Sequence, residues 1–414
     1  MTVKKAFGKI HLWLGFAAGL VVFVSLLAAS VFVWEKELNE WYHHDKIFVA
    51  QVKAHVLPFD SLAATAKKAS VNHSITALNI DRDPEKAYVF MNYKVSKDTG
   101  WSWASGMDDY SKIYVNQYTG KFLGRVDLRY DWIFCTRMLH QCLLLNYDVG
   151  HYIVGGATII IFIMVVTGIM LWWPKNKAAL KQRLWFRWKK STRWKRKNYD
   201  LHNIGGIYTF FFILIFAVTG LVWTFDWWTD GIYRLLGNDP TKVFARPPAP
   251  EPSRDAVSGV YDKVIADAMK RKPSWEDIGV SISKEEQKGK RGINVYLKYT
   301  SGKSGWDESD YYTYHPANGQ LYFTNTQDQK TLGAKWRNSN YAIHVGSIYG
   351  LPTKLLATFI SLFCASLPLS GFLIWWGRRK KAKSTGKPQR NHVERKPDLS
   401  MNLIPPAPSG KAIH

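Results

Sequence analysis

Four histidines stand at the ends of long apolar segments, where their imidazole rings could hold a metal-containing cofactor. His11 and His202 each open an apolar segment, and His140 and His344 each precede another one. Imidazole is a common axial ligand of haem iron, and two imidazoles close both axial positions, which suits electron transfer rather than oxygen binding. The pattern therefore predicts two haem sites, with His11 paired to His202 and His140 paired to His344 as axial ligands of the iron.

Glycines next to the first pair support this interpretation. Gly15 follows His11 by four residues, and Gly206 follows His202 with the same spacing. Residues four apart share one face of a helix, and a glycine there leaves room for a flat macrocycle against the backbone. The chain has no Cys-X-X-Cys-His sequence, which is the signal for covalent haem attachment. Both groups are therefore expected to be haem b, held without covalent links.

His151 competes with His140 as the partner of His344. The register of the two halves favours His140, because it and His344 precede matching Trp-Trp pairs by 32 and 31 residues. Depth favours His151: in one continuous helix, a rise of about 1.5 Å per residue would place His140 roughly 16 Å further from the membrane. The two lie about three helical turns apart, so both could face the same side. We expect His140 to be the ligand and His151 to be a substitute ligand or a neighbour.

A simpler interpretation is that these histidines only bond the backbone or lipid headgroups at the membrane surface. Tryptophan, tyrosine and lysine serve that purpose and are abundant in this chain, so a matched histidine at each of four segment ends favours ligands. Among the other histidines, His43 and His44 could bind a metal outside the membrane, but we expect this adjacent pair to be solvated. His315 is expected at the surface.

The elements that must position the histidines are four apolar segments without a charged residue. Each holds 22 or 23 residues, and about 20 suffice for a helix to cross the hydrocarbon core of a bilayer. They are residues 12–34, 152–173, 203–225 and 355–376. Because no Asp, Glu, Lys or Arg lies within them, an ion transporter is disfavoured. The sequence predicts an α-helical membrane protein with four transmembrane helices.

Positive charge gathers beside these segments and indicates their orientation. The net charge is +24, with eleven Lys or Arg in residues 174–200 and ten after residue 376. Basic residues that flank spans mark the cytoplasmic side, so both termini are expected there. The expected partner of this charge is the lipid bilayer with its anionic headgroups, and no nucleic acid. The first segment could instead be a signal peptide, but its apolar run exceeds the about 7–15 residues of a typical signal core.

The chain looks internally duplicated. In each half a histidine opens a span, an outer segment follows, and a second histidine precedes a span that ends in Trp-Trp. Each outer segment combines a helical pattern, alternating strands and a hairpin signal, which predicts a small α+β domain. The helical patterns cover residues 61–69 and 257–269, the strands 87–95 and 294–299, and the hairpins 114–120 and 313–319.

These features divide the chain into eight predicted segments. We expect a transmembrane helix in residues 1–34, an outer domain in 35–148, a second helix in 149–173, a basic cytoplasmic loop in 174–201, a third helix in 202–226, a second outer domain in 227–350, a fourth helix in 351–377 and a cytoplasmic tail in 378–414. The three cysteines form no Cys-X-X-Cys pair, so neither a disulfide framework nor a zinc site is expected.

This arrangement resembles the PepSY-associated transmembrane helix family over nearly the whole chain before the tail. The residues that carry the resemblance are His11-Leu-Trp-Leu-Gly15, Leu139-His140-Gln-Cys-Leu-Leu-Leu, 168–174, Leu201-His202 to Gly206, His344-Val-Gly346 and Gly350-Leu-Pro352. Each motif is short, but the combination is fairly specific. Members of the family pair four spans with periplasmic PepSY-type domains, which implies two PepSY-like outer domains and a place in the bacterial inner membrane.

The resemblance also implies an activity. The family includes iron-regulated membrane proteins and ferric-siderophore reductases of the FoxB type, which suggests an oxidoreductase with two haems that passes electrons to a periplasmic ferric siderophore or similar complex. Iron would be released because Fe(II) carries less charge than Fe(III). No dinucleotide-binding glycine motif is found, so the donor would be quinol or another protein. The alternative is a haemless scaffold whose PepSY-like domains regulate a periplasmic enzyme.

Overall fold

The computed structural model describes residues 2–97, 100–243, 257–282, 292–300 and 308–385. Internal contacts divide the chain into two units, Met1–Ile374 and Trp375–His414. The first unit holds all eight described strands and almost every described helix. The linker around residues 244–256 and the tail after residue 385 lie outside the described residues.

Four helices in the described part of the chain are long and apolar enough to cross a membrane, as predicted. The candidate spans are Val3–Phe32, Tyr147–Trp172, Trp194–Leu221 and Leu351–Arg379. The shortest has 26 residues, which at about 1.5 Å per residue exceeds the roughly 30 Å of a hydrocarbon core. Large apolar side chains on their surface, such as Trp13 and Leu20 with 69% and 74% exposed, suit a lipid environment.

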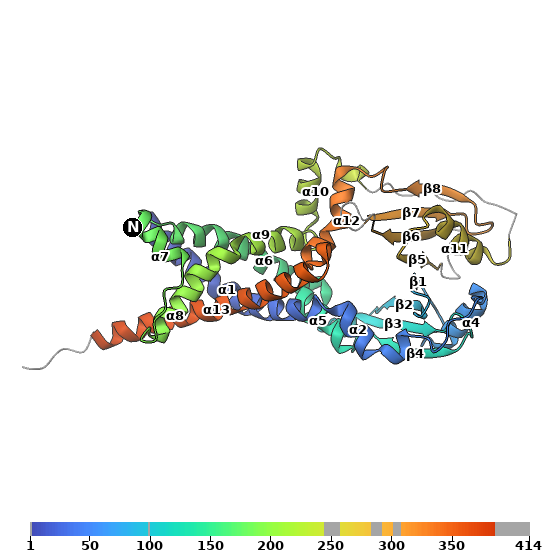
Figure 1. The fold of residues 1–414 in the computed structure, drawn as a ribbon, viewed down its shortest axis with the longest axis horizontal. Coiled ribbons are helices and arrows are strands. Elements are labelled where there is room, and N and C mark those ends of the chain that lie inside the picture. The colour runs from blue at the N-terminus through green and yellow to red at the C-terminus, as the bar shows by residue number, and fades with distance from the viewer. Residues whose placement is uncertain (1, 98–99, 244–256, 283–291, 301–307, 386–414) are drawn as a thin grey trace, which may run out of the picture. The chain divides into compact units, whose positions relative to one another are not determined.

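The spans pack against one another along their lengths (Figure 1). Helix α1 (Val3–Phe32) packs on α6 (Tyr147–Trp172), and α6 packs on α9 (Gly206–Leu221). The fourth, α13, runs from Leu351 to Thr385. The third span is composite, because α8 (Trp194–Asp200) continues through a π-helical turn, Leu201–Gly205, into α9. Isolated π-helical turns within a longer helix are frequent at functional sites.

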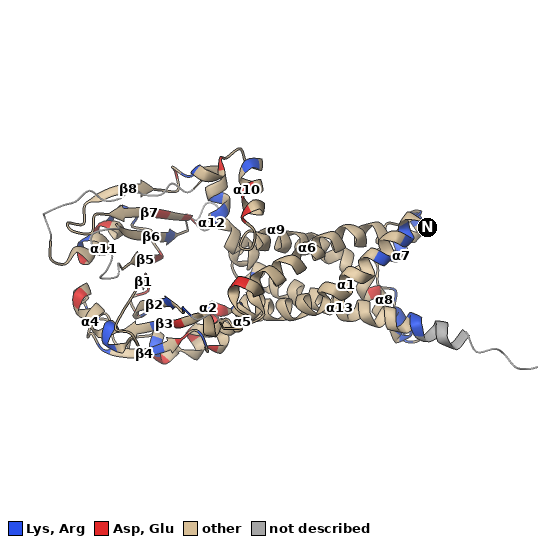
Figure 2. Ribbon diagram, turned by 180° about the vertical axis from the view of Figure 1, so that it is seen from behind, with Lys and Arg blue, Asp and Glu red and all other residues tan. Residues whose placement is uncertain are grey.

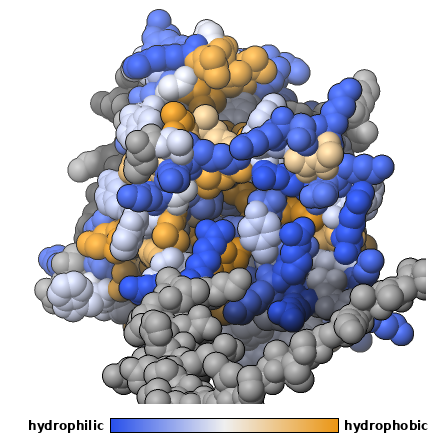
Figure 3. Space-filling model, turned by 90° about the vertical axis from the view of Figure 1, so that its left-hand side faces the viewer, coloured by the Kyte–Doolittle hydropathy of each residue, from blue (hydrophilic) through white to orange (hydrophobic). Residues whose placement is uncertain are grey.

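Basic side chains mark one end of the spans. Helices α7 (Lys177–Leu184) and α8 lie there, and Figure 2 shows blue Lys and Arg on both while the long helices carry almost no charge. Figure 3 looks onto this end and shows hydrophilic side chains spread across it, with apolar atoms between them. Charge is therefore separated from the apolar helices, as a bilayer requires.

Each outer segment folds into helices and four strands in the same order. The first contains α2 (Glu35–Tyr42), α3 (His44–Ile47), α4 (Phe59–Ala69), β1 (Ala77–Asp81), β2 (Tyr88–Val95), β3 (Met107–Val115), β4 (Phe122–Asp127) and α5 (Trp132–Cys142). The second contains α10 (Asp226–Leu235), α11 (Val260–Arg271), β5 (Asp277–Ser281), β6 (Ile293–Tyr299), β7 (Glu308–Tyr314), β8 (Leu321–Asn325) and α12 (Leu332–His344). The expected strands, helices and α+β class are all present.

The eight strands form one antiparallel sheet rather than two separate ones. Their order is β4-β3-β2-β1-β5-β6-β7-β8, so the edge strands β1 and β5 join the two outer segments. The join pairs five residues of each strand, centred on Asn79 opposite Gly279. Strand pairing of this kind covers edges that would otherwise expose unpaired backbone groups. The sequence predicts two small domains, whereas in the structure the two outer segments share one sheet.

Helices α4 and α11 contribute to the main hydrophobic core on one face of the sheet. Alternate strand residues point into it, including Leu78, Phe90, Ile113, Val295 and Leu297, none of which exposes measurable surface. Full burial of such a side chain stabilises a fold by about 1.5–3 kcal/mol. The same core reaches across the β1–β5 join, so the two segments are stabilised together.

Glycine turns close the two predicted hairpins. Between β3 and β4, Gly120 has a φ of +70°, and its N–H donates to Asn116 O. Between β7 and β8, Gly319 has a φ of +65°, and its N–H donates to His315 O. Side chains with a Cβ rarely adopt this conformation, which is why glycine ends both turn sequences.

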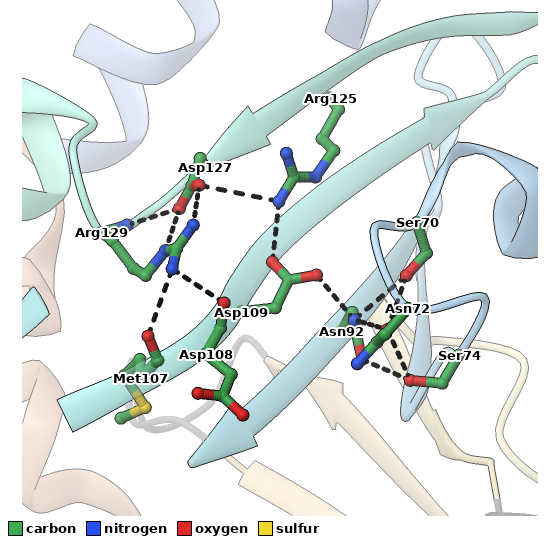
Figure 4. A network of polar contacts seen from close by, with 10 residues as sticks. All are labelled: Ser70, Asn72, Ser74, Asn92, Met107, Asp108, Asp109, Arg125, Asp127 and Arg129. Atoms are coloured by element: carbon green, nitrogen blue, oxygen red, sulfur yellow. Dashed lines mark hydrogen bonds and ion pairs between the residues drawn. The ribbon is translucent and has the colours of Figure 1, made fainter. Parts of the chain in front are cut away.

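A buried polar network ties β2, β3 and β4 to the turn after α4 (Figure 4). Asp109 is 1% exposed and accepts from Arg125 at 2.8 Å and from Asn92 at 2.7 Å. Asn92 also donates to Ser70 and Asn72. Buried polar groups are usually paired. This network therefore fixes how the strands meet the turn after α4.

Candidate functional site

The structure brings His11 and His202 together near the basic end of the spans. His11 lies in α1 and His202 in the π-helical turn before α9. Their ring centres are 6.3 Å apart and the ring planes are almost perpendicular, at 87°. Asn198, one turn before His202, is buried and donates to Ser370 O at 3.0 Å, which anchors this turn to α13.

His140 and His344 form a second pair. Their ring centres are 5.9 Å apart and the ring planes meet at 40°. Both residues lie outside the spans, on the short helices α5 and α12. Burial lowers the pKa of His140 and of His344, so both rings are neutral at physiological pH.

A sharp turn carries His140 back toward the membrane. Helix α5 ends at Cys142, and Leu143 and Leu144 both have positive φ angles, 57° and 58°. The chain then starts α6 at Tyr147, and a Cβ at Gly150 would collide with the Cys142 carbonyl, so the two helices meet closely. The depth argument against His140 assumed one continuous helix and was wrong. Because α5 folds back onto α1, His140 reaches Ser25 inside the first span.

Each of the four histidines places Nδ1 against a hydroxyl group on a spanning helix. The four hydrogen bonds join His11 to Thr167 at 3.0 Å, His202 to Ser370 at 2.9 Å, His140 to Ser25 at 2.9 Å and His344 to Thr219 at 2.8 Å. Each hydroxyl comes from the same half of the chain as its histidine. The two halves therefore present matched histidine–hydroxyl units that face each other.

The hydroxyls also favour the tautomer that carries its proton on Nδ1. Thr167, Ser370 and Thr219 each donate to a main-chain carbonyl of the preceding helical turn, and Ser25 donates to His140 O at 2.9 Å. When the hydroxyls donate to these carbonyls, their oxygens accept from Nδ1–H. Nδ1 of His140 also lies 3.0 Å from the Ser25 carbonyl, which can only accept. Each ring is therefore left with an Nε2 lone pair that faces away from the hydroxyl, as in metal-binding histidines.

Glycines next to three of these hydroxyls let the rings approach the helices. A Cβ at Gly220 or Gly371 would lie 3.2 Å from Cε1 of His344 or His202, and a Cβ at Gly168 would lie 3.4 Å from Cε1 of His11. The first two are closer than ordinary van der Waals contact. The fourth unit differs, because Leu26 follows Ser25. Three of the four histidine rings therefore each pack against a Thr-Gly or Ser-Gly dipeptide.

A cavity of about 220 Å³ opens beside the outer pair. A single water needs only about 10–15 Å³ in this measure, so the cavity has room for a group much larger than a water. His140, His344, Ser25, Gly220, Trp223 and Arg137 line it. The wall is mostly apolar and comes from α1, α5, α6, α9, α12 and α13.

The other predicted residues take different places. His151 lines the same cavity, but its Nδ1 bonds to Tyr147 O on its own helix, and its ring stacks on Tyr147. It is a neighbour of the outer pair, with its ring against Tyr147 and Tyr152. Gly15 lies against Met164, and Gly206 has open space where a Cβ would be. Their contact with a macrocycle stays a prediction.

The remaining histidines that the structure describes do not gather into a further metal site. His43 was expected to be solvated, which is wrong: it is 6% exposed, and its Nε2 lies 2.9 Å from Asp131 Oδ2. Asp131 caps α5 by accepting from Phe134 N–H, so this buried bond organises the helix that carries His140. His44 is exposed, and His315 is partly buried in the β7–β8 turn. Among the described residues, no three His, Cys, Asp or Glu side chains gather as metal ligands.

Sequence reasoning found the four rings but missed the residues that hold them. Thr167, Thr219, Ser370, Gly220 and Ser25 were not singled out. A signal for most of them is present: Thr-Gly or Ser-Gly precedes a tryptophan by three or four residues in α6, α9 and α13. In a membrane segment a Ser or Thr next to glycine is also typical of simple helix packing, so the pattern alone would not have identified a histidine partner.

Comparison with known proteins agrees with this architecture. No curated protein matches the chain. The model of the PepSY-associated TM region family matches residues 9–378, which covers nearly all of the four spans, both outer segments and all four paired histidines. The match covers far more than half of the sequence, and the chain belongs to the PepSY-associated TM region family.

Proposed function

We propose that this chain is a di-haem b-type reductase of the bacterial inner membrane, which passes electrons across the bilayer to a ferric siderophore or a similar ferric complex. The observation that carries the proposal is the pair of histidine couples at two depths of one four-helix bundle, each ring oriented by a hydroxyl. Neither couple needs a charged ligand, which a membrane interior would disfavour.

The geometry of each couple fits one metal ion held between its two imidazole rings. Imidazole nitrogen binds a metal such as zinc at about 2 Å, so two nitrogens on one ion are about 4 Å apart and their ring centres roughly 6 Å apart. The ring centres here are 6.3 Å and 5.9 Å apart. The donor set fits as well, because a second-shell hydrogen bond at the other ring nitrogen is the usual companion of a metal-binding histidine.

Bound haem would supply reversible one-electron exchange at each couple. His11 with His202, and His140 with His344, would hold one haem each through their imidazole rings. They also set the separation: Ser25 follows His11 by fourteen residues in α1, a rise of about 21 Å. The two couples thus occupy different depths, as transfer across a bilayer requires.

Orientation follows from charge. The basic helices α7 and α8 lie at the end of the bundle that holds His11 and His202, which supports a cytoplasmic position for this couple and for both termini. The donor is a quinol or another protein. The outer couple then faces the periplasm, where two PepSY-like domains, copies of one duplicated unit, receive the ferric complex. The proposed reaction is that of a FoxB-type reductase.

Haem content tests the proposal directly. The full chain, produced with ample iron and porphyrin and purified in detergent, should show a Soret band and close to two haems per chain. His11→Ala, His202→Ala, His140→Ala and His344→Ala should each lose about one haem. His151→Ala is the matched control, because it lines the same cavity and should retain both. A colourless wild-type protein would exclude the reductase and favour a haemless scaffold.

Electron transfer can be tested separately. Proteoliposomes would hold a reductant inside and a ferric hydroxamate complex outside, and Fe(II) would be followed with a chelator. Reduction outside should require the wild-type chain and fall to background with His202→Ala or His344→Ala. If His151→Ala falls equally, the assignment of the outer couple is wrong.

A further inference from the structure

Arg137 is placed unusually for a charged residue. It lies in α5, three residues before His140, and its side chain lines the cavity beside the outer couple. The side chain is half-buried. Three residues are nearly one turn, so Arg137 and His140 lie on adjacent parts of the same helix face.

The guanidinium group has no carboxylate partner among the residues that the structure describes. Other arginines there do: Arg125 and Arg129 pair with Asp127, and Arg271 pairs with Asp267. Arg137 is instead held by aromatic rings, with its guanidinium carbon 5.7 Å from the centre of Phe32 and 5.6 Å from that of Phe134. These rings fix the side chain but leave its hydrogen-bond donors unused.

Glu35 is an acidic residue whose carboxyl group interacts electrostatically with Arg137, yet it forms no ion pair with it among the described contacts. Burial raises the pKa of Glu35, which makes its carboxyl group a weaker counter-ion. A partly buried cation is costly unless an anion pairs with it. The cavity wall therefore offers an unsatisfied positive group.

We infer that Arg137 binds a propionate carboxylate of the haem held between His140 and His344. The inference rests on the proposed function and adds to it a carboxylate-binding position. Haem b carries two propionate groups on one edge of the ring, and the planar guanidinium fork matches a carboxylate with two parallel hydrogen bonds. Arg137 is thus a positioning residue that fixes the rotation of the macrocycle about the axis between the two imidazoles.

A nearby cation also favours the reduced state of iron, because reduction removes one positive charge from the site. Arg137 should therefore raise the reduction potential of the outer haem. The inner couple lies about 21 Å away along α1, where this effect should be small. The two haems would then differ in potential in the direction that drives electrons outward.

The test compares the full-length wild type with Arg137→Gln, Arg137→Lys and Arg337→Gln in detergent. Arg337 is the matched control: it lies half-buried on α12, packs over Trp223 at 5.5 Å and does not line the cavity. In a spectroelectrochemical titration, Arg137→Gln should lower the reduction potential of one haem by about 59 mV. This shift corresponds to a tenfold change in the equilibrium constant for its one-electron reduction. Arg137→Lys should keep most of the potential, and Arg337→Gln should match wild type.

A second arm replaces the carboxylate. Apo-protein of each form is reconstituted with haem or with its dimethyl ester, which lacks the negative charge. The wild type should bind the ester at the outer site about tenfold more weakly than haem, and Arg137→Gln should bind both equally. An equal ester penalty in both proteins, or an unchanged potential in Arg137→Gln, would overturn the inference. Either result requires a haem-loaded wild type, so it is distinct from the colourless protein that would exclude the reductase itself.

Discussion

The inner and outer histidine couples share the same histidine–hydroxyl contacts but lie on different supports. The inner couple comes from the spanning helices themselves, with His11 in α1 and His202 in the π-helical turn before α9. The outer couple comes from α5 and α12, short helices that follow the last strand of each outer segment. One couple is thus fixed by helix packing alone, while the other depends on the outer sheet as well.

The two couples therefore depend on different parts of the molecule for the orientation of their rings. At the inner couple, a hydroxyl on the next helix is enough to orient each ring. At the outer couple, a capped helix must first fold back from the sheet before His140 can reach Ser25. We therefore expect damage to the outer segments to remove one haem selectively, and damage inside the bundle to affect whichever couple it contacts.

The largest expected effect comes from Asp131→Ala. Asp131 is buried, caps α5 and holds His43 at 2.9 Å. Losing the cap costs about 1–2 kcal/mol, and leaving His43 without its partner adds about 1–3 kcal/mol. The outer haem should be mostly lost while the inner one stays, as measured by haem per chain. Asn176→Ala, which removes the cap of α7 at the other end, is the control. Equal loss of both haems in Asp131→Ala would contradict the comparison.

A smaller effect is expected when a hydroxyl partner is removed. Thr219→Val and Thr167→Val keep the shape of the side chain but remove the acceptor for Nδ1 of His344 or His11. Loss of such a partner typically weakens metal binding about 10–100-fold. Thr219→Val should weaken only the outer haem and Thr167→Val only the inner one, in competition with a haem scavenger. Thr219→Ser should restore binding, and a Ser variant as weak as Val would point to packing instead.

The glycines behind the rings should have a modest and graded effect. Gly220→Ala would place a methyl group 3.2 Å from Cε1 of His344, whereas Gly168→Ala would lie 3.4 Å from Cε1 of His11. Overpacking at the shorter distance costs about 1 kcal/mol or more, so haem affinity at the outer couple should fall roughly fivefold, and the inner couple should change less. Gly156→Ala, with nothing within 4 Å, should leave both sites unchanged.

The smallest difference is spectroscopic. The inner rings are nearly perpendicular at 87°, and the outer rings meet at 40°. Perpendicular imidazole planes leave two iron d orbitals close in energy, because axial ligands set the electronic structure of the haem. Ferric wild type should therefore give two low-spin EPR signals, with the more anisotropic one lost in His202→Ala. Loss of that signal in His344→Ala would reverse the assignment.

Much of the site could be predicted because its signals are local. Histidines at span ends, apolar runs and basic flanks are properties of short sequences, and the structure brings together both predicted pairs of rings. The hairpins at residues 114–120 and 313–319 were also confirmed, since a glycine with positive φ ends each turn.

The rest depends on contacts between distant residues. Nothing near His140 indicates that Leu143 and Leu144 reverse the chain, since leucine rarely adopts positive φ. Nothing near His43 indicates Asp131, which lies 88 residues away in sequence. The pairing of β1 with β5 also links residues about 200 positions apart, and hydrophobic alternation alone does not reveal which strand edges meet.

The shared sheet has a consequence for the chain as a whole. The stretch between α7 and α8 is the covalent connection between the two halves, yet β1 and β5 already bind them to each other outside the membrane. Two polypeptides produced by a break in that stretch should therefore recognise each other through their exposed strands and assemble. The chain therefore need not be continuous between α7 and α8, but each fragment needs its intact strand, β1 or β5.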